Sequence, residues 1–192
     1  MGSRYDDELW ELVPRDPGPP RATLCDFVRS LGRAEDVLDL GAGDGRLSSC
    51  LQPARLTLAD VSGVALERAR ERLPDARIVE LEPDAPLPLP DSSFDLVLCA
   101  ETLEHVRDVQ LLLSEARRVL RPGGRLALTT PAHGRGTALG LLLRGFEREF
   151  DPLSPHLRFF TAKSLRRLLE DMGFEVESLT RRDRALLAVA RR

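Results

Sequence analysis

The chain has 192 residues, of which 42% are hydrophobic and 31% are charged, as in a globular protein with one domain or two small ones. Lys and Arg number 28 against 31 Asp and Glu, and a net charge of −3 argues against a general nucleic-acid binder. The apolar runs fall short of the ~20 residues that a transmembrane helix requires, and we find no signal peptide, so we expect a cytoplasmic protein.

The cysteines Cys25, Cys50 and Cys99 are widely spaced and include no CxxC pair. Disulfide frameworks and zinc sites have closer and more regular cysteine spacings. We therefore predict neither, and we expect the protein to occupy a reducing compartment.

The N-terminal piece holds Tyr5 and Trp10 and ends at a proline-rich breaker, PRDPGPPR, at residues 14–21. A helix is predicted over residues 21–32. We interpret residues 1–34 as an N-terminal lid and first helix, in which an aromatic side chain could close over a bound ligand.

Residues 35–192 form the predicted main domain, in which strand-like and helical patterns alternate. The expected strands cover residues 37–40, 56–59, 77–81, 94–99, 125–130, 174–179 and 185–190. The early strands are nearly continuous apolar runs, as in a parallel sheet covered on both faces. Only residues 180–184 join the last two strands, which is too short for a helical crossover, so this pair should be antiparallel.

Three of the intervening helices have recognisable ends. Ser62 is a predicted N-cap, Asp108 opens the next helix, and Thr161 caps the last one. Pro122-Gly123-Gly124 is predicted to stop the second helix and Gly173 the third.

The run VLDLGAGDGRLS, residues 37–48, is an apolar strand that enters a glycine-rich turn. Such turns bind nucleotides, but the dinucleotide fingerprint GxGxxG needs a glycine where this chain has Arg46. Asp39 and Asp44 place negative charge where a pyrophosphate would lie. S-adenosylmethionine carries a sulfonium and an ammonium but no phosphate, so it suits this turn better than a nicotinamide dinucleotide does.

Asp60 supports a nucleoside ligand, because it ends the second strand 19 residues after Gly41, where a carboxylate can accept ribose hydroxyls. The glycines would let the backbone approach this ligand closely. Asp39 and Asp44 have an alternative interpretation as turn-forming and helix-capping carboxylates. A nicotinamide-dependent oxidoreductase is the alternative enzyme class.

Five segments carry a family resemblance: VLDLGAGDGRLS, LADVS, DAPLPLPDSSFDLVLCAETLEHV, LLSEARRVLRPGGRLALTTP and HLRFFTAKSLRRLLEDMGFEV. Together they resemble class I S-adenosylmethionine-dependent methyltransferases over about residues 35–190, and more narrowly the ubiquinone-biosynthesis O-methyltransferases. The resemblance implies an α/β fold with a Rossmann-like seven-stranded sheet of order 3-2-1-4-5-7-6, strand 7 antiparallel, and helices on both faces. It also implies S-adenosylmethionine as cofactor and S-adenosylhomocysteine as product.

The resemblance implies cofactor contacts at the ends of the first four strands. They are Asp39, Gly41, Ala42 and Gly43 at the methionine end, Asp60 at the ribose, Val61 beside the adenine, and Cys99, Ala100 and Glu101 after the fourth strand. An acid after the third strand would meet the adenine amino group. The spacing there departs from the usual pattern by about a residue, so Asp84, followed by Ala85, matches best and Glu82 competes.

The run ETLEHV places Glu101, Glu104 and His105 within five residues, and His156 precedes the last helix. On a helical turn, Glu101 and His105 would share one face. Two carboxylates and two imidazoles could hold Mg, Mn or Zn, and similar ExxEH motifs are metal ligands in ubiquinone-biosynthesis and small-RNA 2′-O-methyltransferases. Alternatively, the Glu-His pair only shapes the loop and caps the following helix.

Without a metal, His105, His133 or His156 is a candidate catalytic base, because an unperturbed imidazole titrates near neutrality. Methyl transfer to a good nucleophile can also proceed without a base, through proximity and alignment. The connection over residues 132–160 is long enough to be a substrate lid. Its predicted helix, residues 137–146, could cover a hydrophobic substrate, touch a membrane surface, make a dimer contact or pack into the core.

We therefore expect a methyltransferase whose acceptor is a small molecule, a sugar or a lipid-linked intermediate, with oxygen as the preferred nucleophile. RNA 2′-O-methylation is the first alternative, supported if Arg135, Arg144, Arg148 and Arg158 form a basic face. A non-catalytic, cofactor-binding partner subunit is the second. No DNA partner and no transmembrane segment are expected.

Overall fold

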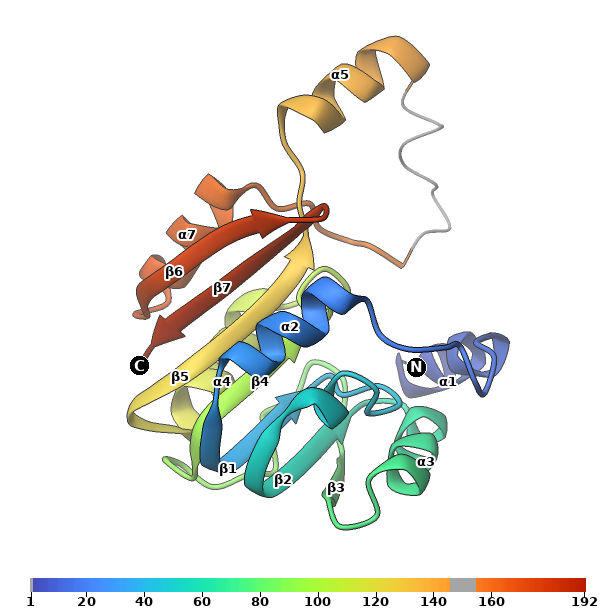
Figure 1. The fold of residues 1–192 in the computed structure, drawn as a ribbon, viewed down its shortest axis with the longest axis vertical. Coiled ribbons are helices and arrows are strands. Elements are labelled where there is room, and N and C mark those ends of the chain that lie inside the picture. The colour runs from blue at the N-terminus through green and yellow to red at the C-terminus, as the bar shows by residue number, and fades with distance from the viewer. Residues whose placement is uncertain (1, 146–154) are drawn as a thin grey trace.

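The computed structural model describes residues 2–145 and 155–192. Its centre is a seven-stranded sheet of order β3-β2-β1-β4-β5-β7-β6 (Figure 1). Neighbouring strands are parallel except for β7, which is antiparallel to both β5 and β6. The predicted sheet order and the antiparallel last pair are therefore confirmed.

All seven predicted strands are present, and most are longer than predicted. They are β1 (Arg33–Leu40), β2 (Gln52–Asp60), β3 (Arg77–Glu80), β4 (Phe94–Ala100), β5 (Leu120–Pro131), β6 (Glu175–Arg182) and β7 (Ala185–Arg191). β1 and β2 extend into polar sequence at their start, because Arg33 already pairs with Gln52. The apolar pattern marks only the buried part of a strand, so these exposed ends were missed.

The helices are α1 (Gly2–Leu12), α2 (Ala22–Ser30), α3 (Gly63–Arg72), α4 (Val109–Val119), α5 (Arg135–Arg144) and α7 (Ala162–Asp171), with a short 3₁₀ turn, η1 (Ser48–Cys50). The three predicted N-caps are confirmed. The side chains of Ser62, Asp108 and Thr161 each accept hydrogen bonds from the first-turn backbone N–H groups of α3, α4 and α7.

Pro122-Gly123-Gly124 does not stop α4 as predicted. The helix already ends at Val119, and the three residues lie within β5. They form an irregular stretch between Leu120, which pairs with Phe94, and Arg125, which pairs with Leu96. The chain therefore passes directly from helix to strand, and the Pro-Gly-Gly turn bends the strand instead.

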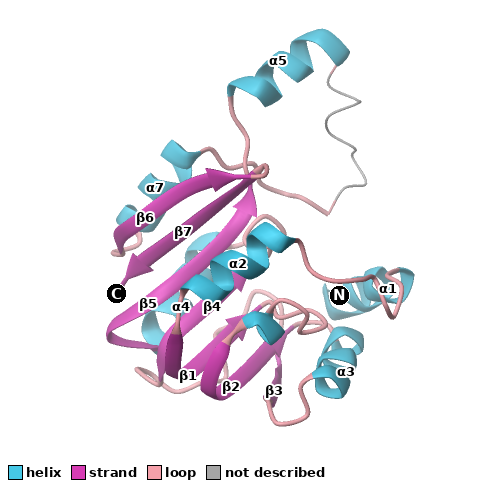
Figure 2. Ribbon diagram, in the orientation of Figure 1, coloured by secondary structure: helices cyan, strands magenta, loops and turns pink. Residues whose placement is uncertain are grey.

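Helices cover both faces of the sheet (Figure 2). Side chains alternate along β4, so Val97 and Cys99 join a large core together with residues of α4 and α7. Leu96 and Leu98 face the opposite side and join a second core with residues of α2. This two-faced burial explains why the early strands are almost entirely apolar.

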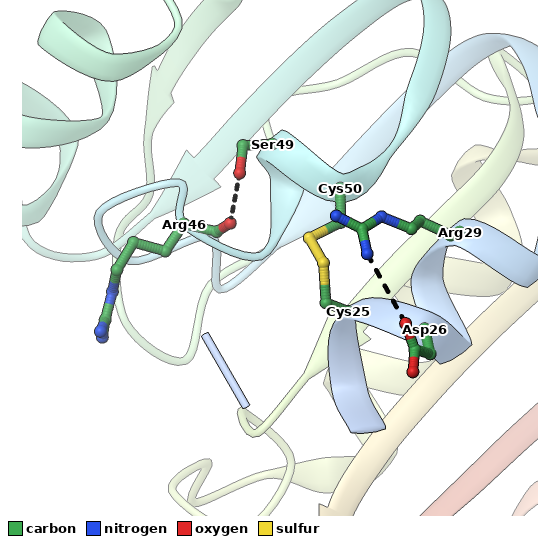
Figure 3. Close-up of a disulfide and its surroundings, with 6 residues drawn as sticks. All are labelled: Cys25, Asp26, Arg29, Arg46, Ser49 and Cys50. Carbon is green, nitrogen blue, oxygen red and sulfur yellow. Dashed lines mark hydrogen bonds and ion pairs between the residues drawn. A yellow bond between two sulfur atoms is a disulfide. The ribbon is translucent and has the colours of Figure 1, made fainter. Parts of the chain in front are cut away.

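Cys25 and Cys50 form a disulfide that joins α2 to η1, with 5.6 Å between their Cα atoms (Figure 3). The prediction of no disulfide is therefore wrong, and the reducing compartment inferred from it loses its basis. The two cysteines are 25 residues apart, and only the packing of α2 beside η1 brings them together. Cys99 remains a free, buried thiol.

Among residues 2–145 and 155–192, none of the helices combines the length and the apolar character that crossing a bilayer requires. The lid predicted over residues 132–160 is described only in part. Its helix, α5, projects away from the sheet (Figure 1), and Leu139, Leu142 and Leu143 are exposed. The alternative that this helix packs into the core is therefore wrong.

Candidate active site

The glycine-rich turn lies at the carboxyl end of β1 and is fastened to β2. The N–H groups of Gly41 and Ala42 both donate to the carbonyl of Ala59, at 2.8 and 3.0 Å. The Gly43 N–H donates to Oδ2 of Asp60 at 2.8 Å, and the Ser62 N–H donates to Oδ1 at 2.9 Å. The buried Asp60 carboxylate thus joins two adjacent loops, and its burial raises its pKa.

Gly41 and Gly43 allow side chains of the same chain to approach the turn. Both have positive φ, and a Cβ at Gly41 would lie 2.3 Å from Thr102 side-chain atoms. A Cβ at Gly43 would lie 2.6 Å from the Trp10 ring of α1. The expectation that the glycines let a ligand approach closely stays a prediction, and in this structure the side chains of Thr102 and Trp10 lie there.

Helix α1 is held beside the turn by contacts with α3. Oδ1 of Asp7 accepts hydrogen bonds from the Ser62 hydroxyl at 2.6 Å and the Val64 N–H at 3.2 Å. The Arg68 guanidinium lies 5.9 Å from the centre of the Trp10 ring, within cation–π range. The N-terminal piece therefore reaches the glycine turn, where the predicted aromatic lid would have to act.

The two acids of the turn have different surroundings. Asp39 is buried, accepts a hydrogen bond from the Ser48 hydroxyl, and has its pKa raised to about 7 chiefly by burial. Asp44 forms ion pairs with Arg46 at 2.9 Å and with Arg72 at 3.3 Å. The Asp44 charge is thus neutralised within the protein, and its Oδ1 accepts from the Arg46 N–H at 3.2 Å, which agrees with the alternative role as a turn-forming carboxylate.

The residues predicted near the adenine lie around the ends of β2, β3 and β4. Val61 is partly buried against the large core, and Asp84 pairs with Arg107 at 3.6 Å. Glu82 and Asp84 are both exposed, so the choice between them stays a prediction. The Cys99 side chain lies in the core, where burial raises its pKa above the ordinary value, and Ala100 and Glu101 follow it.

Glu101 begins a tight turn after β4, not the predicted helical turn. It has a φ of +53°, and its N–H donates to the Thr129 carbonyl at 2.9 Å. Its Oε1 accepts from the Thr129 hydroxyl at 2.9 Å, and its Oε2 lies 3.6 Å from Arg21 Nη1. Glu101 is therefore turned toward β5 and the start of α2, and it does not join the predicted metal ligands.

The other three predicted ligands do come together. The ligand atoms of Glu104, His105 and His156 all lie within 4.8 Å of one another. The N–H groups of Leu157 and Arg158 donate to the Glu104 carbonyl, which holds the segment bearing His156 against the turn. Glu104 and His156 are 52 positions apart, and they come together because backbone hydrogen bonds join their two loops.

Glu104 is the buried member of this group. Only 1% of the residue is exposed, and its Oε2 accepts from the Thr130 hydroxyl at 2.9 Å. Its Oε1 has no hydrogen-bond partner among the described residues. Burial, and then the nearby charge of Glu101, raise the pKa of Glu104 to about 7.

The three histidines gather at the same edge of the sheet. His105 Nδ1 lies 3.1 Å from the Pro155 carbonyl, to which it donates, so Nε2 is left unprotonated toward Glu104. The His105 and His156 rings are 4.8 Å apart, and the His133 ring packs edge-on against Phe159 at 5.0 Å. Burial is the foremost cause that lowers the pKa of all three, so they are neutral at pH 7.

A hollow of about 780 Å³ opens beside this edge, between α5, the end of β5 and the β6–β7 turn. We call it the α5 hollow. Its lining includes His133, two leucines of α5, and three arginines that the sequence analysis did not select: Arg21, Arg181 and Arg184. The sequence signal was the stretch TRRDR, which we used only as evidence for a short connection.

Comparisons with known proteins agree with this geometry. Residues 38–128 match the methyltransferase-domain family. A probable S-adenosylmethionine-dependent methyltransferase of Mycolicibacterium smegmatis is 38% identical over 159 residues, which are 78% of this chain and 54% of that protein.

Residues 38–128 carry a methyltransferase domain.

Two more proteins are similar to this chain, the first in sequence and the second in fold alone. The 27-O-demethylrifamycin SV methyltransferase of Amycolatopsis mediterranei is 42% identical over 105 residues, 50% of this chain and 39% of its own. A crystal structure of an S-adenosylmethionine-dependent methyltransferase from Aquifex aeolicus has a TM-score of 0.65 at 21% identity and covers 98% of this chain and 95% of that one.

These comparisons favour the predicted methyltransferase over the nicotinamide-dependent alternative, and the Mycolicibacterium relative is itself named as S-adenosylmethionine-dependent. The chain spans about half the length of the first curated relatives it matches. The methyl acceptor therefore has to be inferred from the residues of the site.

Proposed function

We propose that the protein transfers the methyl group of S-adenosylmethionine to an oxygen atom of a small-molecule, sugar or lipid-linked acceptor. The observation that carries the proposal is the cluster of Glu104, His105 and His156 at the edge where the α5 hollow opens. These groups can take up a hydroxyl proton, which an oxygen nucleophile must lose. The relative named for 27-O-demethylrifamycin SV is consistent with an oxygen acceptor.

The residues at the glycine turn fit the cofactor. Asp60 has one hydrogen bond from the backbone on each carboxylate oxygen, which leaves a lone pair on each for the ribose hydroxyls. Asp39, Ala42 and Glu101 border the same edge, and the side chains of Thr102 and Trp10 fill the space over Gly41 and Gly43. S-adenosylmethionine supplies the electrophilic methyl group when bound. We propose that Trp10 and α1 shift to admit it.

Glu104, His105 and His156 also fit a divalent cation. The unpartnered, buried Oε1 of Glu104 is an acceptor that a cation would satisfy, and the Pro155 carbonyl fixes the His105 tautomer that exposes Nε2. One carboxylate and two imidazoles suit Zn or Mn better than Mg. A bound cation would lower the pKa of an acceptor hydroxyl.

The neutral histidines can act in the same reaction without a metal. Their lowered pKa values keep unprotonated imidazoles available at pH 7, and His156 lies beside both His105 and His133. We propose that one of them accepts the hydroxyl proton as the oxygen attacks the methyl group. Alignment of the oxygen with the sulfonium supplies the remaining acceleration.

The basic face that would favour RNA stays a prediction, because the structure describes the side chain of only one of its four arginines. The Arg158 guanidinium donates to the carbonyls of Val106 and Arg107, so it is engaged within the protein. Arg148 and the side chains of Arg135 and Arg144 lie outside the description. Small acceptors therefore remain our proposal.

The metal proposal is tested by calorimetric titration of Mn²⁺, Zn²⁺ and Mg²⁺ into protein saturated with S-adenosylhomocysteine. We expect stoichiometric binding that Glu104→Gln abolishes. Glu101→Gln is the matched control and should leave the stoichiometry unchanged, because Glu101 is outside the cluster. Absence of metal binding in the parent protein would leave the histidines as bases.

Oxygen transfer is tested with hydroxyl and amine acceptors built on the same aromatic skeleton, by following formation of S-adenosylhomocysteine. We expect turnover with the hydroxyl members. Turnover confined to the amines would contradict the proposal. Binding of S-adenosylhomocysteine without turnover on any acceptor would support the non-catalytic subunit.

A further inference from the structure

We propose that the α5 hollow binds an acceptor that has an apolar body and an anionic group, with the anion held by Arg181 and Arg184 of the β6–β7 turn. This inference rests on the proposed function, because it takes the hollow as the acceptor site. It goes further in naming the chemistry of the acceptor. The volume of about 780 Å³ lies within the range of small-molecule sites.

The positive side of the hollow comes from three arginines. Arg21 precedes α2, Arg181 lies near the end of β6, and Arg184 lies in the turn between β6 and β7. The Arg181 guanidinium lies beside Gly134 at the start of α5, 3.6 Å from where a Cβ of that residue would stand. The charges of Arg181 and Arg184 contribute to the lowered pKa of His133, so both act on the interior of the hollow.

The part of the chain that the structure describes offers little negative charge to oppose these arginines. Asp183 is the one acid among the lining residues, and its carboxylate accepts a hydrogen bond from the Thr23 hydroxyl of α2. Within residues 2–145 and 155–192, no ion pair joins Arg181 or Arg184 to a carboxylate. Their charges are therefore available to a ligand, and an anion would be favoured there.

The turn that carries Arg184 has an unusual backbone. Asp183 and Arg184 have φ of +43° and +67°, in the left-handed region that two-residue hairpin turns require. Glycine or asparagine usually occupies such positions, and larger side chains are disfavoured there. The Arg184 carbonyl accepts from the Ala132 N–H at 2.7 Å, which fixes the turn against the end of β5. An arginine in this position is thus held over the hollow.

Part of the lining of the hollow is apolar. Leu139 and Leu143 of α5 are 58% and 74% exposed, and Pro131 and Ala132 lie at the end of β5. A cavity lined by both exposed leucines and arginines suits a ligand with both an apolar and an anionic part. A sugar or a neutral small molecule would leave one of these surfaces unused.

The hollow is next to the reacting groups. Arg21 Nη1 lies 3.6 Å from Oε2 of Glu101, and His133 belongs to both the hollow and the group of three histidines. An anion held at the β6–β7 turn would place the rest of the acceptor toward Glu101 and the histidines. Binding in the hollow and methyl transfer at this edge are therefore compatible.

The test uses 6-hydroxy-2-naphthoate and its neutral amide, 6-hydroxy-2-naphthamide. Both are titrated calorimetrically into protein saturated with S-adenosylhomocysteine, so that binding is measured without turnover. We expect the carboxylate to bind at least ~10-fold more tightly than the amide, because charge-assisted hydrogen bonds are about twice as strong as neutral ones. The double variant Arg181→Gln/Arg184→Gln should lose this preference and retain its affinity for S-adenosylhomocysteine.

Arg182→Gln is the matched control. Arg182 lies on the same hairpin but borders a different depression, with Arg125 and Glu177, and should leave the naphthoate affinity unchanged. Equal affinity for acid and amide, no binding of either, or an equal loss in Arg182→Gln would overturn the proposal. Arginine-dependent binding of phosphatidylglycerol vesicles without binding of free naphthoate would also overturn it, in favour of a membrane surface. If naphthoate binds but is not methylated in the presence of S-adenosylmethionine, the anion site stands and the proposed oxygen transfer fails.

Discussion

The two halves of the sheet edge are built differently. Around β1, β2 and β4, Asp39, Asp44 and Asp60 are buried and hydrogen-bonded or ion-paired within the protein. Around β5, β6 and β7, Arg181 and Arg184 have no ion pair among the described residues, and they line the α5 hollow together with exposed leucines. The acids of the cofactor half are therefore held in place by groups of the protein itself, whereas the acceptor half presents surfaces that another molecule must complete.

The largest difference between the halves should appear on removing Asp60. In Asp60→Ala the Gly43 and Ser62 N–H groups lose a charged acceptor, and the ribose loses its partner. We expect S-adenosylhomocysteine affinity to fall at least ~100-fold, since hydrogen bonds to charged groups contribute ~1.5–3 kcal/mol each. Calorimetry measures this, with Asp183→Ala on the acceptor half as a control of unchanged affinity. Equal losses of S-adenosylhomocysteine affinity in both variants would contradict the division of the sheet edge into a cofactor half and an acceptor half.

Reduction of the Cys25–Cys50 disulfide should weaken the fold next. Closing a loop of this length restricts the unfolded chain, so we expect the free energy of unfolding to fall by about 3 kcal/mol. Urea unfolding with and without reductant measures the change. The double variant Cys25→Ser/Cys50→Ser should be insensitive to reductant. A wild-type midpoint that reductant does not move would show that the link is absent in solution.

Glu104 should make stability depend on pH. Its pKa is raised from the ordinary 4.5 to about 7, so the unfolded chain loses this proton at lower pH than the folded protein does. Stability should therefore fall between pH 4.5 and 7, and Glu104→Gln should remove ~2–3 kcal/mol of that fall. Urea unfolding in EDTA at several pH values tests this without metal. Asp39 titrates in both the wild type and Glu104→Gln. If stability falls equally with pH in the two proteins, the assignment to Glu104 is contradicted.

The smallest effect should come from α5. Leu142 is 85% exposed, so Leu142→Gln should change the free energy of unfolding by less than ~0.5 kcal/mol. Urea unfolding checks this. A loss well above that value would mean that the helix packs against the protein in solution, and the acceptor half would then be less open than described.

Much of the fold could be predicted from the sequence because its signals are local. Ser62, Asp108 and Thr161 cap helices through hydrogen bonds within four residues. The antiparallel β6–β7 pair followed from the short link between them, and buried strands stood out as apolar runs. The strand order itself came from the family resemblance, because no local rule gives the order of strands in a sheet.

The parts that could not be predicted depend on meetings between distant segments. Cys25 meets Cys50 because α2 packs beside η1, and Asp44 is neutralised by Arg72, 28 residues away. Glu101 leaves the expected metal cluster because the loop turns at positive φ and Thr129 captures its carboxylate. A sequence pattern indicates which residue types are present, but the packing of the elements determines which of them come into contact.

Trp10 has a consequence for observing this protein. It is the only tryptophan in the 192 residues, and its ring lies against Gly43 of the turn at which we propose that the cofactor binds. Intrinsic fluorescence excited at the indole therefore comes from that single place. Any movement of α1 away from the turn would change its emission, so the protein carries a built-in optical reporter of whether its cofactor turn is covered or open.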